Sequence, residues 1–382
     1  MGSRLEAVVK RTIRVLFIVI TAGILFCTLY PFDPFPPNRV TWTKDSNGIC
    51  FSQRGVAFTE KPLSLSGNAL RGDSCTLELW IKPAQTDSVA VVLDFYEPGN
   101  PWRFLIHQYQ SGLILTHDVA SRFGRPVRSK ADIDEGLRQN QLCLITIASG
   151  PNGTSVYFDA KSKRTLPGFK ISLADLSGQL LIGSSAVRPE SWSGEIHGLA
   201  IYPKKFEPED VADSYRRWIE GKVTSTDNVF AKYMFTEGTG TIVHDTGSTQ
   251  SDLFIPKIYR VPHHSFLRLP WYEFYPTSDY LSDVVNNVAG FIPFGFLLYL
   301  LPSTSERRHP ILYTILIGAI FSLSIEVMQA FVPQRDSGTT DIITNTLGTA
   351  VGVLLARSTV VRSLFERFRA DWLTRACPEE KY

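Results

Sequence analysis

Long uncharged apolar stretches occur near both ends of the chain, and short alternating ones fill the middle. The first runs from Val15 to Phe32, about the length needed to cross a hydrocarbon core of roughly 30 Å. It continues into YPFDPFPP without the small-residue exit of a cleaved signal peptide, so we predict a retained membrane helix. Three further stretches begin at Val284, Ile311 and Ile342. The pattern therefore predicts a four-helix α transmembrane bundle.

Basic residues flank the outermost of these spans. They are Arg4, Lys10, Arg11 and Arg14 before the first span, and Arg357, Arg362, Arg367 and Arg369 after the last. Lys and Arg are enriched in cytoplasmic loops. We therefore predict a multi-pass protein of the cytoplasmic (inner) membrane with both termini cytoplasmic and residues 33–280 extracytoplasmic. The tail after the last span has an apolar face with interspersed Arg, which is typical either of an interfacial helix or of a short soluble tail.

Residues from about Val40 to Lys257 alternate short apolar runs with Gly, Pro, Ser, Asn and Asp clusters, which is typical of an all-β domain. The predicted strands are CTLELWIKP, VAVVLDFY, WRFLIHQY, SGLILTH, LCLITIAS, TSVYFDA and GQLLIGS. Two packed antiparallel sheets would bury their apolar faces, which predicts a β-sandwich. A single helix is predicted from Pro208 to Glu220. The predicted segments are 1–37 (N-terminus and first span), 38–257 (sandwich), 258–280 (interfacial linker), 281–358 (three spans) and 359–382 (cytoplasmic tail).

Composition narrows the functional classes. The chain has 39 Lys and Arg against 37 Asp and Glu, a formal charge of +2, which argues against a nucleic-acid partner. There is no C-x-x-C pair, Gly-rich phosphate loop, H-E-x-x-H or G-x-S-x-G, so no resident metal or cofactor is expected and enzymatic activity is not favoured. Among Cys50, Cys75 and Cys143, at most one internal disulfide can form, and Cys50–Cys75 is the pairing we expect.

Polar residues recur within or beside the C-terminal spans at helical spacing. Such residues usually face the bundle interior and mark a site, so we predict a ligand-binding set of Asp283, Asn287, Glu326, Gln329, Arg335, Asp341 and Asn345. DVVNNVAG and DIITNTLG match at their Asp, second Asn and Gly, which indicates two parallel hairpin repeats with the sandwich inserted in the first. The alternative, in which Asp283 and Asp341 only cap their helices, stays open. Glu326 is expected either to be protonated or to find a partner such as Arg335 or Asn345.

Residues of the predicted sandwich supply candidates for ligand binding. Trp102, Tyr109 and Trp192 are candidates for stacking on a glycan, although aromatic side chains in a sandwich also form its core. A calcium ion on the sandwich is a further hypothesis, with Asp94, Asp118 and Glu195 as its oxygen ligands. The alternative is that these three are solvated carboxylates at strand ends.

The middle segment resembles a known family. LELWIKP, TSVYFDA, LLIGSS and SWSGEIHGLAIYPKKFEPEDVADSY follow one another in the order seen in the laminin-G-like, concanavalin-A-like lectin sandwich. The resemblance covers roughly Gly48 to Tyr215 and implies a jelly roll and carbohydrate binding. The segment YMFTEGTGTIVHDTGS looks like the strand that usually opens such domains, here placed after the rest. The hairpin turn that is usually Asp-Gly in the family is Asp159–Ala160 in this sequence.

The C-terminal spans resemble the VanZ-like family of small membrane proteins. The family pattern is met by Asn287, Phe291, Pro293, Phe294, Gly295, Ser322, Glu326, Gln329, Arg335, Asp341, Asn345 and Gly348. The family's named member is associated with resistance to the glycopeptide antibiotic teicoplanin, and the resemblance implies a membrane unit rather than a particular reaction. The resemblance to this family covers the first span and residues from Asp283 to Ala356.

These observations support one leading hypothesis and leave others open. The leading hypothesis is a bacterial cell-envelope protein whose sandwich binds envelope glycan and whose bundle binds a membrane lipid or lipid-linked sugar headgroup. One alternative is an anchored lectin, adhesion or scaffold module with a purely structural bundle. A second is an envelope lipid-modifying enzyme with Glu326 as general base. A transport role would require a homo-oligomer, because four spans enclose only a small pathway.

Overall fold

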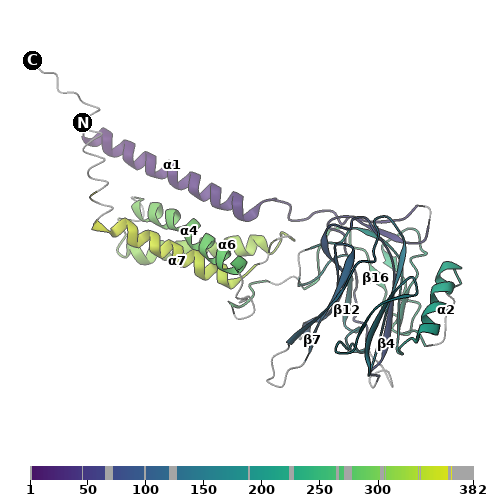
Figure 1. Cartoon of the computed structure of the whole chain (residues 1–382). Coiled ribbons are helices and arrows are strands. Elements are labelled where there is room, and N and C mark those ends of the chain that lie inside the picture. The colour runs from purple at the N-terminus through teal and green to yellow at the C-terminus, as the bar shows by residue number, and fades with distance from the viewer. Residues whose placement is uncertain are drawn as a thin grey trace, which may run out of the picture. The chain divides into compact units, whose positions relative to one another are not determined.

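The computed structural model describes residues 2–44, 46–64, 72–98, 100–119, 127–187, 190–222, 228–263, 266–270, 278–301, 305, 307–333, 335, 337–359 and 363. The chain forms two compact units, one of residues 1–34 with 265–382 and one of residues 35–264. Most of the predicted cytoplasmic tail and the middle of the predicted linker lie outside the described residues. Figure 1 labels the helices and some of the strands named below.

The helical unit consists of α1 (Gly2–Leu29), α4 (Ser278–Leu300), α6 (Pro310–Gln329) and α7 (Thr339–Arg357). Helices α4 and α7 run parallel, because successive residues of one meet successive residues of the other. Gly348 lies against the Val288 carbonyl, and Gly352 lies against the Ile292 carbonyl one turn later. Because α4 and α7 run the same way, the predicted parallel arrangement of DVVNNVAG and DIITNTLG is confirmed. The repeat is not symmetric in packing, since a Cβ atom on Gly290 would meet nothing within 4 Å.

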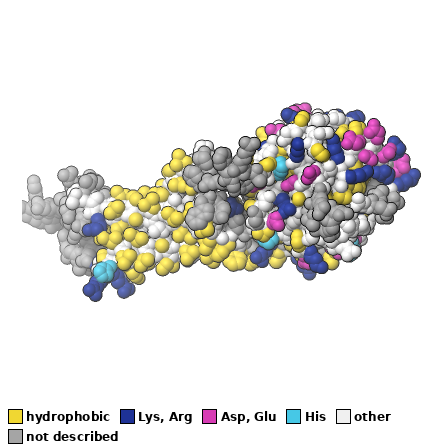
Figure 2. Space-filling view, turned by 90° about the horizontal axis from the view of Figure 1, so that it is seen from below, with side chains coloured by type: hydrophobic (Ala, Val, Ile, Leu, Met, Phe, Trp, Pro, Cys, Tyr) yellow, Lys and Arg dark blue, Asp and Glu magenta, His cyan; other side chains and the backbone are white. Residues whose placement is uncertain are grey.

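Three described helices are long and apolar enough to cross a membrane: Ala7–Leu29, Tyr280–Leu300 and Pro310–Gln329. The fourth predicted span folds as α7 but does not join this group, because Asp341, Asn345 and several Thr residues dilute its apolar residues. The prediction of four spans is therefore supported for three of them. Figure 2 shows hydrophobic side chains gathered over the helical unit and charged side chains over the sandwich.

In α7 the exposed side chains are apolar and the buried ones include polar groups, the opposite of a helix on the surface of a water-soluble protein. Its exposed positions include Ile343, Leu347 and Leu354, whereas Asn345 is buried and only 4% exposed. The same reversal occurs in α6, where Leu316 and Ile320 are exposed while Glu326 is 1% exposed. An apolar exterior around a polar interior is what a lipid environment selects.

The second unit is a sandwich of two antiparallel eight-stranded sheets, counted over the described residues. Sheet one has the order β1-β2-β13-β4-β9-β10-β11, with β14 also paired to β13, and sheet two has the order β15-β16-β3-β12-β5-β6-β7-β8. The bounds in sheet one are β1 Val40–Trp42, β2 Ile49–Phe51, β4 Cys75–Pro83, β9 Cys143–Gly150, β10 Gly153–Phe158, β11 Lys161–Leu166, β13 Gly194–Tyr202 and β14 Ala231–Tyr233. Those in sheet two are β3 Ala57–Thr59, β5 Val89–Glu97, β6 Asn100–Tyr109, β7 Gly112–Val119, β8 Val127–Ile133, β12 Gln179–Ile182, β15 Ile242–Val243 and β16 Leu253–Phe254.

The inner faces of the two sheets form one core, into which Phe95, Phe104 and Trp192 are fully buried. Helix α2 (Pro208–Ile219) covers the outer face of sheet one and buries Val211 and Trp218 there. The chain enters and leaves the sandwich at one place, because the Asn38 amide donates to the Lys257 carbonyl over 3.0 Å. Adjacent ends are what an inserted domain requires.

All seven predicted strands are present, because their alternating apolar positions match the period of a strand. The predicted helix is present as α2. The hairpin β10–β11 turns through Asp159 and Ala160 at φ of +49° and +59°, so two L-residues occupy positions where glycine is favoured. Asp159 supports the turn by accepting a hydrogen bond from the Leu144 amide at 2.9 Å. The segment YMFTEGTGTIVHDTGS starts at Tyr233, the last residue of β14, which pairs with β13. It also contains β15, which lies in the other sheet.

The predicted Cys50–Cys75 disulfide is wrong. Both thiols are free, and they lie on opposite faces of sheet one. Cys75 is fully buried in the core between the sheets, whereas Cys50 alternates with the core residues Ile49 and Phe51 and therefore points outward. Side chains on opposite faces of a sheet cannot be joined by a disulfide without moving the backbone.

Candidate functional site

Glu326 is the most deeply buried carboxyl group in the described part of the helical unit. It lies on α6, 1% exposed, and its Oε2 atom accepts a hydrogen bond from the Gly338 amide at 2.8 Å. Gly338 immediately precedes α7. This hydrogen bond ties α6 to the N-terminal end of α7.

Gln329 lies one turn further along α6. Only one of the two polar atoms of its side-chain amide has a hydrogen-bond partner among the described residues. Its Nε2 atom donates to the Thr28 carbonyl at 3.0 Å. A carbonyl can only accept, so this contact fixes the amide orientation and leaves Oε1 as the other atom. Oε1 is buried without a hydrogen-bond partner among the described residues, in a side chain that is 7% exposed. Buried polar atoms are normally paired, so this oxygen marks a position where a donor is missing.

The Arg335 side chain binds backbone carbonyl groups at the C-terminal end of α1. Its guanidinium donates to the Cys27 carbonyl at 3.0 Å and to the Tyr30 carbonyl at 3.1 Å. Carbonyls of a last helical turn lack intrahelical donors and carry partial negative charge, so a cation there stabilises the helix end. Arg335, a member of the predicted ligand-binding set, thus binds backbone carbonyls of α1.

The two remaining contacts join α7 to its neighbours. The Asn345 amide donates to the Ser322 hydroxyl on α6 at 3.0 Å, and its Oδ1 atom has no partner among the described residues. The Asn287 amide on α4 donates to Asp341 at 2.7 Å. Asp283 is exposed about one helical turn before Asn287 on α4, and among the described residues no contact joins it to the set.

Six of the seven predicted residues thus lie at one end of the helical unit, where α1 and α6 end and α7 begins. We call Ser322, Glu326, Gln329 and Asn345 the bundle cluster. Sequence reasoning missed an isolated parallel β-bridge between Arg268 and Gly338 at this end. The Arg268 amide donates to the Ser337 carbonyl at 3.1 Å, and the Thr339 amide donates back to the Arg268 carbonyl at 2.9 Å. Nothing in the side-chain pattern around Arg268 signalled this pairing.

The three aromatic candidates of the sandwich lie in different environments. Trp192 is 1% exposed and its indole donates to Gln108 at 2.7 Å inside the core, so the prediction that it stacks on a glycan is wrong. Trp102 is half-buried, and the Arg128 guanidinium lies 3.5 Å from its ring centroid. Tyr109 is 49% exposed and lines a cleft of about 740 Å³ together with Asp132 and Glu135.

The three carboxylates predicted to share calcium do not come together. Asp94 is fully buried, where its Oδ2 atom accepts from the Ser185 hydroxyl at 2.8 Å and the Ala186 amide at 3.0 Å. Asp118 pairs with Arg128 at 3.3 Å. Within the described ranges, no three His, Cys, Asp or Glu side chains are grouped as a metal ion would need.

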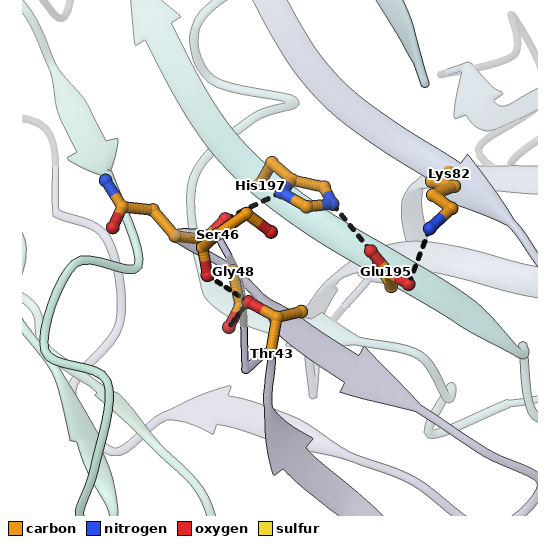
Figure 3. A network of polar contacts seen from close by, with 7 residues as sticks. Thr43, Ser46, Gly48, Lys82, Glu195 and His197 are labelled. Carbon is orange, nitrogen blue, oxygen red and sulfur yellow. Dashed lines mark hydrogen bonds and ion pairs between the residues drawn. The ribbon is translucent and has the colours of Figure 1, made fainter. Parts of the chain in front are cut away.

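Glu195 belongs to a polar network on the outer face of sheet one (Figure 3). It accepts from Lys82 at 3.0 Å and lies 2.9 Å from His197, whose other ring nitrogen is 2.6 Å from the Asn47 carbonyl. Although burial raises the pKa of Glu195, hydrogen bonds from Lys82 and His197 lower it below its usual value overall. The network joins β4, β13 and the β1–β2 loop, which is a structural role.

Two family matches agree with this architecture. Residues 230–362 match the VanZ/LLP1 family, and residues 58–212 match the concanavalin A-like lectin/glucanases superfamily. The first match therefore begins within the sandwich unit, at β14, and reaches to the end of the helical unit. The chain has no significant match among curated proteins.

The solved structures that resemble this chain have low sequence identity to it and low TM-scores. A pentraxin from Limulus polyphemus is 15% identical over 46% of this chain and 78% of its own, with a TM-score of 0.32. The sialidase CBM40 of Ruminococcus gnavus bound to α2,3-sialyllactose is 13% identical over 44% and 97%, with a TM-score of 0.35. The receptor-binding domain of botulinum neurotoxin D is 14% identical over 47% and 46%, with a TM-score of 0.33. The strand pairing described above, rather than these matches, carries the assignment of the sandwich.

Proposed function

Because the chain joins a VanZ-like membrane segment to a concanavalin-A-like sandwich, we propose that it is a cell-envelope protein that holds a lipid-linked headgroup in its helical unit and glycan on its sandwich. The observation that carries the first half is the Gln329 Oε1 atom, which is buried on the same helix as Glu326 and has no hydrogen-bond partner among the described residues. An unsatisfied buried polar atom costs about 1–3 kcal/mol, which a ligand donor would recover.

The chemistry of the bundle cluster selects the kind of headgroup. Its unpartnered atoms are the amide oxygens of Gln329 and Asn345, and Glu326 contributes a carboxyl group. Arg335 is already engaged by the carbonyls of α1. The cluster therefore favours a headgroup rich in donors, such as sugar hydroxyls or an ammonium group, over a headgroup whose only charge is negative.

This function predicts selective stabilisation by lipids. Purified protein in detergent is heated with monoglucosyl diacylglycerol, phosphatidylethanolamine or phosphatidylglycerol, and Tm is measured. We expect the first two to raise Tm more than the third, because only a bound ligand that favours the folded state raises it. Gln329→Met and Glu326→Gln keep side-chain size and are expected to reduce the selective increase.

Ser324→Ala is the matched control, since Ser324 lies on the same helix, is exposed, and bonds only to the Ile320 carbonyl. Equal Tm increases with all three lipids, or unchanged selectivity in both cluster variants, would contradict headgroup binding. In that event the bundle is an anchor and the protein a tethered lectin or scaffold. Turnover of a labelled lipid-linked sugar that is lost in Glu326→Gln would instead make it an enzyme.

We further propose that α7 is a fourth span, so that both termini are cytoplasmic and the sandwich extracytoplasmic. Its 19 residues extend about 28 Å, it runs parallel to α4, and its exposed residues are apolar. A fluorescent protein fused after Arg357 should then be active in the cytoplasm, and an alkaline phosphatase fused at the same position should be inactive. The opposite pair of results would place this end outside and leave three spans.

A further inference from the structure

His117 occupies an unusual place at the rim of the sandwich. Along β7 it shares a face with Leu113 and Leu115, which point into the core between the sheets. It is 5% exposed, and its ring meets Phe169 edge-on with centroids 4.7 Å apart. Among the described residues neither ring nitrogen has a hydrogen-bond partner. A buried imidazole whose ring nitrogens lack hydrogen-bond partners is uncommon, because buried polar groups are normally hydrogen-bonded.

The imidazole borders a cleft of about 450 Å³, which is within the size range of small-ligand sites. The β7 end contributes His117 and Asp118 from sheet two, and the β9–β10 turn contributes Gly150 from sheet one. The cleft thus opens where the two layers separate. Asp73, Lys170 and Asp175 complete its charged lining.

The charges of this lining select the ligand. Three carboxylates face one ammonium group, and Arg128 pairs with Asp118 at 3.3 Å. Asp175 is held in place because its Oδ2 atom accepts from both the amide and the hydroxyl of Ser172 at 2.8 Å. A negatively charged ligand would be repelled by this excess of carboxylates, whereas hydroxyl and ammonium groups can donate to it.

Burial lowers the pKa of His117, while Asp175 and Asp118 act in the opposite direction. A neutral imidazole has one donor and one acceptor nitrogen, which matches a hydroxyl group that both donates and accepts. Carboxylates with such an imidazole are suited to a polyol rather than to an apolar ligand.

We propose that this cleft is the glycan site of the sandwich and that it takes saccharides that are neutral or carry amino groups, with His117 at its base. This inference rests on the proposed glycan binding. It adds where on the sandwich the glycan binds and which charge the glycan carries. The Tyr109 cleft, with its exposed aromatic ring, is the competing location on the same unit.

The test measures binding of three probes to the full-length protein in detergent by calorimetry: chitin tetrasaccharide, chitosan tetrasaccharide and α2,3-sialyllactose. We expect the first two to bind more tightly than the acidic third. His117→Ala should weaken their binding about tenfold or more, the loss of roughly one good hydrogen-bonded contact. His244→Ala is the matched control, because His244 is exposed and pairs with Asp252 away from the cleft.

Asp73→Lys provides a second variant whose folding is not in question, since Asp73 is exposed. It should shift the preference from chitosan toward sialyllactose. Tight probe binding that neither variant changes, or that Tyr109→Ala alone abolishes, overturns the cleft assignment but leaves glycan binding intact. If sialyllactose binds best to the unaltered protein, the charge class is wrong. Absence of binding by all three probes refutes both this inference and the proposed glycan binding.

Discussion

Gly352→Leu is expected to prevent assembly of the helical unit. A Cβ atom on Gly352 would lie 2.2 Å from the Ile292 carbonyl oxygen and 2.6 Å from the Phe296 amide nitrogen. Both are backbone atoms, so α4 and α7 would have to separate along the contact that holds them together. We expect a loss of more than about 3 kcal/mol, the upper range for overpacking. Size-exclusion chromatography and thermal unfolding in detergent measure this loss.

Gly290→Leu is the control for the same change in size and hydrophobicity. A Cβ atom there would meet nothing within 4 Å, and the residue is exposed on α4. This variant should remain folded and elute as the unaltered protein does. If Gly352→Leu behaves like Gly290→Leu, the close parallel packing of α4 and α7 is not the structure of the protein.

Asp94→Asn is expected to stabilise the sandwich at alkaline pH. Burial raises the pKa of Asp94 to about 7, although hydrogen bonds from Ser185 and Ala186 oppose the shift. Between about pH 4 and 7 the folded protein therefore keeps a proton that the unfolded chain releases, so the free energy of unfolding falls as pH rises through this window. The shift is about three pKa units. Since one unit corresponds to about 1.4 kcal/mol, the full loss is about 4 kcal/mol above pH 7.

Asparagine keeps the shape of the side chain and stays neutral, so the variant should lose this pH dependence and exceed the unaltered protein in stability at pH 8. Urea unfolding followed by tryptophan fluorescence at pH 4 to 8 measures it. Asp134→Asn is the control, because that side chain is 89% exposed. Identical pH profiles for the unaltered protein and Asp94→Asn would show that Asp94 is charged in the folded state.

Periodicity explains which parts of the fold could be predicted. Strands such as β4 and β9 have nine and eight residues, enough for an alternating pattern, and the sequence located them. Strands β15 and β16 have two residues each, too few for any period, and only the tertiary pairing makes them strands. The disulfide prediction failed for a related reason, because it ignored which face of the sheet each cysteine occupies.

The sequence predicted which polar side chains of α6 share a face, but not what they contact. Helical spacing placed Glu326 and Gln329 on one face of α6, and both are buried. Their partners are the Gly338 amide and the Thr28 carbonyl, backbone groups that have no side-chain signature. Arg335 likewise binds backbone carbonyls of a helix about 300 residues earlier in the chain. In the sandwich, the spacing of Leu113, Leu115 and His117 showed an inward histidine that sequence reasoning overlooked.

The most direct test of headgroup binding is native mass spectrometry of the intact protein with the lipids that co-purify in mild detergent. The account predicts a lipid with a sugar or amino headgroup retained by the unaltered protein and by Ser324→Ala, and lost from Gln329→Met. Retention of the same lipid by Gln329→Met, or exclusive retention of a lipid whose headgroup is only anionic, would contradict it.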